Sequence, residues 1–310
     1  MSLDMVDEED RKDYLDSVAF SGDRIFSSKN RGENMLDTEI VIYCICDEVW
    51  KVFAKKDDPQ CKMTSPEIMA FSVIAAHSYN GNYQRARLVS LALKFFSKIL
   101  SLSQLVRRIH QIPYEVWMMV FTALQIFLRD KDKNIFIIDS FPVPAYQNHK
   151  SFRARIFATK EYHGYTASKK QYFFGIKVHM IVDVDGVPIE FLFTPGSVAD
   201  IAAVPMFSMH LPANSLLLGD RAYTNYALED FLAEAQNILM IPKRKLTHQR
   251  QHSSENNELL KLHRNRIETV FSSIVSRMSR RIHVRTEKGF CLKILFHILA
   301  YMVALYLAWG

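Results

Sequence analysis

The sequence has only four cysteines, and no two of them form a CxxC pair. Three of the four, Cys44, Cys46 and Cys291, lie in apolar stretches. Structural zinc and a disulfide framework are therefore not expected, and reduced cysteines fit a cytoplasmic protein. The first residues, MSLDMVDEED, lack the basic and apolar segments of a signal peptide, so we expect no export.

The sequence also lacks an apolar run of the length that a bilayer requires. The longest candidate, Ile294 to Trp309, is interrupted only by His297 and falls short of the roughly 20 residues that span a membrane. We therefore expect a buried core helix there and no membrane partner.

Charge is unevenly distributed along the 310 residues. Residues 1–48 carry 13 acidic and 5 basic side chains, whereas residues 241–285 carry 11 Lys or Arg and 3 Glu. The net charge thus changes from −8 to +8 between these two segments. A basic C-terminal part favours a polyanion such as DNA as the partner.

The first 130 residues have the pattern of a helical domain. Residues 1–33 mix acidic runs with Ser, Gly and Asn, and we expect this segment to be flexible. Apolar residues then recur at helical spacing. Helices are expected at residues 35–53, 66–78, 102–112 and 114–128. The sequence therefore predicts an all-helical domain at 34–130, which we expect to bind DNA ends.

Two helix starts carry capping signals. Ser65 precedes Pro66, a pair typical of an N-cap followed by the first helical residue. Ser101 and Gln104 have the spacing of a capping box.

From Asp130 onward, short apolar runs alternate with helical patterns. Strands are expected at 134–140, where a Ser and a Pro-rich turn end the run, at 216–220 and at 238–242. Residues 172–197 predict two long strands joined by a turn at Asp185-Gly186. Helices are expected at 199–209, 225–236, 254–281 and 289–309. The order predicts a ribonuclease-H-like α/β domain at 131–310, a mixed sheet flanked by helices.

Two aspartates come directly after apolar strands. Asp139 ends FIID, and Asp220 ends LLLGD. Because ligands of open α/β sheets bind beyond the carboxyl ends of strands, we expect both side chains to project into one crevice. Glu268 lies on the helix expected after the last strand, at the edge of its buried stripe.

Three carboxylates from separate elements fit a Mg²⁺ site for phosphodiester cleavage. Two ions roughly 4 Å apart stabilise both the entering and the leaving oxygen, and Mn²⁺ can substitute. An Asp after a strand is also a common turn former or N-cap, and a Glu on a helix usually faces solvent. Other acids fit those plainer roles: Asp183 and Asp185 belong to the hairpin turn, and Asp200 is expected to cap a helix.

Four segments resemble the DDE transposases of bacterial insertion sequences, most closely the insertion sequence 982 family. They are IIDSFPVP (137–144), YFFGIKVH (172–179), GDRAYTN (219–225) and RNRIETVFSSI (264–274). SLSQLVRRIH (101–110) is similar to a segment that the family carries ahead of its first Asp. The resemblance implies that Asp139 and Asp220 are the first and second catalytic aspartates and that Glu268 is the catalytic glutamate.

The resemblance departs from the family pattern at two positions. Related transposases often place a Tyr three residues before an Arg, and a Lys seven residues after the Glu. Arg264 and Glu268 match, whereas Lys261 and Val275 occupy the Tyr and Lys positions. The contacts that the Tyr and the Lys of related transposases make with transposon ends are therefore not expected at Lys261 and Val275. Arg277 could substitute for the missing Lys.

Three groups of basic residues are candidates for phosphate contacts. They are Arg264, Arg266, Arg277, Arg280 and Arg281 on and after the Glu268 helix, Lys169 and Lys170 in a basic and aromatic loop, and Arg107 and Arg108 in the helical domain. The plainer alternatives are a solvated helix face, an ordinary surface loop and a helical pair that binds nothing.

The sequence as a whole indicates a Mg²⁺-dependent transposase, located in the bacterial cytoplasm and associated with the nucleoid when active. The resemblance implies that it acts on double-stranded DNA as a homodimer and joins a 3′-hydroxyl end to target DNA. Two alternatives stay open. One is a nuclease of the same fold without strand transfer, and the other is a catalytically silent, domesticated DNA-binding protein.

Overall fold

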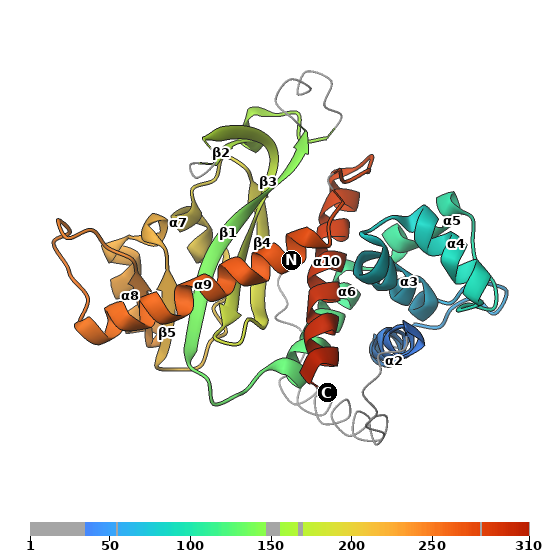
Figure 1. The fold of residues 1–310 in the computed structure, drawn as a ribbon, viewed down its shortest axis with the longest axis horizontal. Helices are drawn as coiled ribbons and strands as arrows, with labels where there is room; N and C mark the ends of the chain where they lie inside the picture. The colour runs from blue at the N-terminus through green and yellow to red at the C-terminus, as the bar shows by residue number, and fades with distance from the viewer. Residues whose placement is uncertain (1–34, 54, 147–155, 167–169, 280, 310) are drawn as a thin grey trace. The chain divides into compact units, whose positions relative to one another are not determined.

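A computed structural model describes residues 35–53, 55–146, 156–166, 170–279 and 281–309 (Figure 1). The expected flexible segment 1–33, Lys169 and Arg280 lie outside the described residues. The chain divides into two compact units. Unit 1 contains the chain up to Arg129 together with 277–279 and 293–310, and unit 2 contains 130–276 and 280–292.

Unit 1 is built from helices, as the sequence predicts. Its helices are α2 (Met35–Phe53), α3 (Ser65–Tyr79), α4 (Tyr83–Leu93), α5 (Leu102–Gln111), α6 (Tyr114–Leu128) and most of α10 (Glu287–Trp309). The sequence analysis missed α4, whose outward face carries exposed Leu88, Leu91 and Leu93 and therefore obscures the apolar period.

The two predicted caps have different outcomes. Ser101 and Gln104 form the expected capping box at the start of α5. The cap of α3 was placed one residue too late, because Thr64 and not Ser65 is the N-cap and pairs with Glu67 in a capping box. Ser65 instead donates both its amide and its hydroxyl to Asp57. A hydroxyl at either position satisfies the cap pattern, but only Thr64 has a Glu three residues later to complete a capping box.

Helix α10 is long and apolar enough to cross a membrane by length and composition alone. It extends from Glu287 and is therefore longer than the apolar run that marks it in the sequence. Its middle is nevertheless buried among the helices of unit 1, where Phe296 packs against Trp117 with ring centroids 4.6 Å apart. Burial in a helical core accounts for the apolar composition without a bilayer.

Unit 2 contains a mixed sheet. The described strands are β1 (Ile135–Tyr146), β2 (His163–Thr166), β3 (Gln171–Asp183), β4 (Pro188–Pro195), β5 (Ser215–Gly219) and β6 (Ile238–Pro242). Their order is β2-β3-β1-β5-β6, and β4 also pairs with β3. Strand β3 is antiparallel to β1, whereas β5 is parallel to β1 and β6 is parallel to β5. This is the ribonuclease-H-like arrangement, and the predicted fold class is confirmed.

Strand β1 is longer than predicted, because it continues through Pro142 and Pro144 to Tyr146. Among the described strands only β3 accompanies it there, since pairing with β5 stops at Ile138. The two prolines are two residues apart, so their nitrogens point to the same side of the strand. A proline costs no ladder hydrogen bond where that side has no neighbouring strand.

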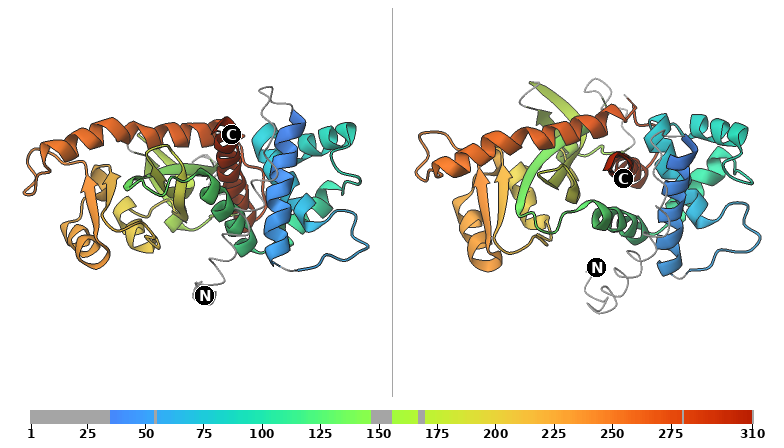
Figure 2. Two further views of the ribbon diagram at one scale, coloured as in Figure 1. Left: turned by 90° about the horizontal axis from the view of Figure 1, so that it is seen from below. Right: turned by 60° about the horizontal axis from the view of Figure 1, so that its bottom comes forward.

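Helices cover both faces of this sheet. Helix α9 (Ser254–Ser276) contacts β1 and β5, and α8 (Tyr226–Gln236) contacts β6. Figure 2 shows α9 along one face of the sheet and α8 on the opposite face. The helix expected at 199–209 is shorter, because α7 (Asp200–Ala203) passes into a 3-10 turn, Val204–Met206. Pro205 lies within that turn and cannot donate a helical hydrogen bond.

Gly175 allows the close approach of β1 and β3 near the end of their pairing. A Cβ on this residue would lie 2.3 Å from the Val143 carbonyl oxygen and 2.9 Å from the Ala145 nitrogen. Both are backbone atoms, so the strands would have to separate. We expect Gly175→Ala to lower the free energy of unfolding by roughly 1–3 kcal/mol in urea titrations of the full chain.

The matched control is Gln171→Ala, at an exposed position of the same strand. Equal stability of the two variants would contradict the close approach of the strands at Gly175.

Candidate active site

Asp139 and Asp220 lie side by side in the sheet. In the parallel pairing of β1 with β5, Ile138 is registered with Gly219, and the two aspartates are the next residues of their chains. Neighbouring strands run about 4.8 Å apart, so the two carboxylates leave the sheet at neighbouring positions. The structure therefore brings the two predicted aspartates together at the end of β5.

The Asp139 carboxyl has an unfavourable electrostatic environment. Its pKa is raised from the ordinary value of 3.8 to about 7, mainly by burial and to a lesser extent by the negative charges of Asp220 and Asp200. The amide of Ser140, 2.7 Å from Oδ1, and the positive charge of Arg264 lower the pKa. A half-buried carboxyl among other carboxyls is a group that a cation would stabilise.

Asp220 has a structural role as well. Its Oδ1 accepts a hydrogen bond from the Ala222 amide at 2.6 Å and caps the 3-10 turn Arg221–Tyr223. This is the N-cap role that the sequence allows for an Asp after a strand. Capping fixes the orientation of the side chain and leaves its other oxygen for a further ligand.

Helix α9, which carries Glu268, packs on β1. Phe271 packs on Phe141 with ring centroids 4.6 Å apart, and Arg264 acts electrostatically on Asp139. Residues 264, 268 and 271 share one helix face at i, i+4 and i+7 spacing. Glu268 thus lies between two residues that approach the segment around Asp139, and its side chain is exposed.

The acidic residues fit a divalent ion chemically, because carboxylate oxygens are the ligands that Mg²⁺ prefers. Among the described residues, however, no three His, Cys, Asp or Glu side chains are grouped closely enough to hold a metal ion. The structure therefore groups Asp139 with Asp220 and leaves Glu268 outside a three-ligand group.

Asp200 is a charge near the site that the sequence analysis assigned to a helix cap. That assignment is incorrect, because Ala199 occupies the N-cap position of α7 and Asp200 follows it. Strand β4 is antiparallel to β3, which is antiparallel to β1, so the carboxyl ends of β4 and β1 point the same way. Asp200 does not directly follow β4, which ends at Pro195, so the strand-end argument that selects Asp139 and Asp220 does not select it.

The described basic residues differ in how they are placed. Arg266, Arg281, Lys170 and Arg107 are exposed. Arg108 is half-buried, with its guanidinium 3.3 Å from Asp57 and 3.4 Å from the Met63 carbonyl oxygen. Arg277 is half-buried too and belongs to unit 1, where its carbonyl lies near His297. The structure gives Arg108 an internal partner, which weakens its case as a phosphate contact.

The hairpin of β2 and β3 carries stacked aromatic rings. The His163 ring stacks on Phe174 and on Tyr172, with centroid distances of 4.6 and 5.1 Å. Tyr165 and Tyr172 are about half exposed. This surface belongs to the basic and aromatic segment from which the sequence predicts a DNA contact.

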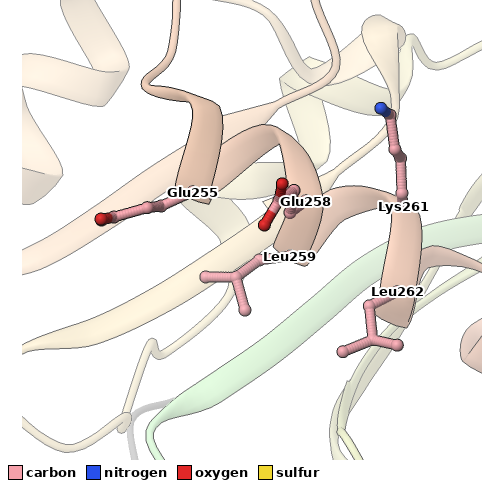
Figure 3. Close-up of a pocket in the computed structure, with 5 residues that line it drawn as sticks. All are labelled: Glu255, Glu258, Leu259, Lys261 and Leu262. Carbon is pink, nitrogen blue, oxygen red and sulfur yellow. The ribbon is translucent and has the colours of Figure 1, made fainter.

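A hollow of about 640 Å³ lies along the first half of α9, away from the aspartates (Figure 3). Its lining consists of Glu255, Glu258, Leu259, Lys261 and Leu262. These side chains come from a single helix, so the hollow is an open surface feature and not an enclosed site.

A comparison with models of protein families gave a match to the second half of the chain. The family model described as "Transposase DDE domain" matches residues 130–303, which is more than half of the chain. The chain belongs to this family. The matched segment contains Asp139, Asp220 and Glu268 together with the whole mixed sheet. The comparison with curated proteins gave no match.

A comparison with solved structures found a distant similarity. The structure is the "Cryo-EM structure of piggyBac transposase synaptic complex with hairpin DNA (SNHP)", with 10% sequence identity and a TM-score of 0.47. The alignment covers 95% of this chain and 70% of that chain.

The environment of Asp139 in this DDE domain gives a prediction about stability. Because the pKa of Asp139 is raised on folding, its charged form destabilises the folded state, and the penalty grows as the pH rises from about 4 to about 7. We expect Asp139→Asn to stabilise the metal-free protein at pH 7.5 by roughly 1–3 kcal/mol. Chemical denaturation in EDTA at pH 7.5 and pH 4.5 measures the gain, which should shrink at the lower pH.

Asp230→Asn is the matched control, since Asp230 is exposed and paired with Arg250. If Asp139→Asn is instead less stable than the wild type at pH 7.5, the prediction is contradicted, because the charged carboxylate would then have favourable partners in the folded protein.

Proposed function

We propose that this DDE transposase cleaves phosphodiester bonds at transposon ends and joins the released 3′-hydroxyl to target DNA. The observation that carries the proposal is the neighbouring position of two aspartates. Asp139 lies in β1 where its pairing with β5 stops, Asp220 follows the last residue of β5, and the charge of Arg264 on α9 acts on Asp139. Membership of the transposase family supports the DNA substrate and the transfer step.

Asp139 and Asp220 would hold divalent metal, Mg²⁺ or Mn²⁺, with Glu268 as the third acidic ligand. Bound there, two such ions would stabilise the charge that develops on the attacking and leaving oxygens of a phosphodiester. The capping contacts of Asp220 and the Ser140 amide fix the directions of the two aspartates. In this proposal the exposed Glu268 side chain would turn toward the two aspartates and complete the ligand set.

The proposed reaction has two phosphoryl transfers. In the first, a water oxygen attacks the phosphorus, the bond from phosphorus to the 3′ oxygen breaks, and that oxygen leaves with a proton as a 3′-hydroxyl. In the second, this hydroxyl attacks a phosphorus of target DNA and displaces a 3′ oxygen of the target. Arg264, whose charge acts on Asp139, would bind the phosphate, and the exposed Arg266 and Arg281 would bind the flanking backbone.

The narrower expectations belong to the same proposal. The motifs around Asp139, Asp220 and Glu268 favour a place near the insertion sequence 982 family, in a bacterial cytoplasm. The joining of two transposon ends favours a homodimer on double-stranded DNA. The helices of residues 34–130 would bind the transposon end, with the exposed Arg107 as a contact.

We expect Asp139→Asn, Asp220→Asn and Glu268→Gln each to reduce Mg²⁺-dependent cleavage of end-containing DNA by roughly 10²–10³-fold or more, because each removes a negative ligand from the metal site. Binding of the same DNA, measured by fluorescence anisotropy, should be retained. Glu258→Gln is the matched control, an exposed glutamate on the same helix (Figure 3).

If Asp139→Asn still cleaves the DNA, Asp139 is not a catalytic metal ligand and the assignment is wrong. A pre-cut end with a labelled 3′-hydroxyl and a plasmid target then separates a transposase, which yields joined product, from a nuclease, which yields none. A wild-type chain that binds DNA without cleaving it would be the silent DNA-binding protein.

We expect Arg266→Ala to weaken DNA binding similarly for all sequences and to reduce the slope of log K against log salt by about 0.9, the value for one phosphate contact. Lys51→Ala serves as the control, because Lys51 already pairs with Asp47 and Glu48. Binding titrations from 50 to 200 mM salt measure both slopes, and an unchanged slope in Arg266→Ala would remove this residue from the DNA surface.

A further inference from the structure

A buried polar cluster lies behind Asp139 on the opposite face of the sheet. Phe141 points toward α9, so Asp139, two residues earlier, points the same way, whereas Ser140 points to the other face. Ser140 is registered with His179 and Pro142 with Lys177, so these two β3 side chains share the face of Ser140. The cluster therefore lies on the side of the sheet away from Arg264 and Glu268.

Asp200 is the centre of this cluster. Its Oδ1 accepts hydrogen bonds from the Ser140 hydroxyl at 2.8 Å and from the Lys177 ammonium at 3.1 Å. Lys177 also donates to the Val198 carbonyl oxygen at 2.8 Å, which ties it to the loop ahead of Asp200. The Lys177 and Asp200 side chains are only 15% and 22% exposed, so the ion pair is poorly screened by solvent.

Two further side chains close the cluster. His179 is fully buried, with Nε2 2.8 Å from the Thr194 hydroxyl and Nδ1 4.0 Å from Asp200. Tyr223 is also fully buried, and its hydroxyl lies where the charges of Asp139, Asp200 and Asp220 all act on it. Packing on both sides leaves Asp200 little freedom to move.

The segment held by Asp200 is the part of β1 that has lost a neighbour. Beyond Ile138 no β5 residue pairs with β1, so β3 is the one strand of the described part of the chain that pairs with β1 there. Asp139 is the first residue of this segment, and the charge of Asp220 repels it. This repulsion would displace β1. The hydrogen bond from Ser140 to Asp200, on the opposite face of the sheet, holds the strand in place.

The chemistry of Asp200 separates it from the proposed metal ligands. An ammonium group already lies at hydrogen-bond distance from its Oδ1, and the positive charge of that group opposes the binding of a divalent cation to the same carboxylate. Asp200 Oδ1 also accepts a hydrogen bond from the hydroxyl of Ser140, the residue that follows Asp139 in the chain.

We infer that Asp200 is a positioning residue, which through Ser140 and Lys177 fixes the β1 segment that carries Asp139. The inference rests on the proposed function, because it assigns to Asp139 the role of a metal ligand. Groups that orient a metal ligand from behind typically contribute 10–100-fold to metal affinity.

The test uses Mn²⁺ as the probe and isothermal titration calorimetry of the full chain, without DNA. Ser140→Ala removes only the hydroxyl that links Asp200 to β1, and Asp200→Asn keeps the shape but removes the charge that holds Lys177. We expect each variant to bind Mn²⁺ about 10-fold or more weakly than the wild type. Circular dichroism selects a temperature at which every protein is folded.

Glu190→Gln is the matched control. Glu190 accepts hydrogen bonds from the amides of Ser208 and Met209, in the same unit but away from β1. A purely structural tether at Asp200 would behave like this control, with lower stability and unchanged Mn²⁺ affinity, and that result would overturn the inference. Hydrogen exchange of residues 135–146 gives a second reading without metal. Exchange should accelerate in Ser140→Ala and stay unchanged in the control.

The wild type and Asp139→Asn distinguish a failure of the inference from a failure of the proposed function. If the wild type binds Mn²⁺ and Asp139→Asn does not, the metal site stands and the Ser140 and Asp200 variants decide the inference. If the wild type binds no Mn²⁺, the proposed function fails and the inference fails with it.

Discussion

The repulsion between acidic side chains at the end of β5 is the constraint on which the site depends. The sheet places Asp139 and Asp220 on adjacent strands and partly buries the first of them. Nothing in the hydrophobic packing of unit 2 requires a charge there, and burial makes the charge unfavourable. Carboxyls with a raised pKa in such a position are typical of binding and catalytic sites, which supports the role proposed for this pair.

The surrounding structure can be understood as support for this unfavourable arrangement. The ladder between β1 and β3 continues past the end of β5, so the strand that carries Asp139 keeps one partner. Helix α9 packs on the same face through Phe271 and brings Arg264 as a compensating charge. From the other face, the ion pair of Asp200 and Lys177 holds Ser140. Both faces of the sheet thus contribute to the position of a single carboxyl.

Local sequence patterns were sufficient to predict the strand ends of the site. The apolar runs FIID and LLLGD identify buried strands, and the end of a strand in an α/β sheet locates Asp139 and Asp220. Asp200 escaped the same reasoning because its partner Ser140 is 60 residues away in the chain and only the folded sheet brings them together. Local rules fail for a related reason at Pro142, where the end of the pairing between β1 and β5 allows the strand to continue through a proline. The position of Glu268 relative to the aspartates stays a prediction, since helical spacing fixes its face and not its distance.

A crystal structure of the protein soaked with Mn²⁺, with anomalous scattering to locate the ions, tests the central claim most directly. The account predicts that manganese binds between Asp139 and Asp220 and that the Glu268 side chain turns to complete the ligand set. Manganese that binds elsewhere, or Asp139 and Asp220 without a shared ion, would contradict it.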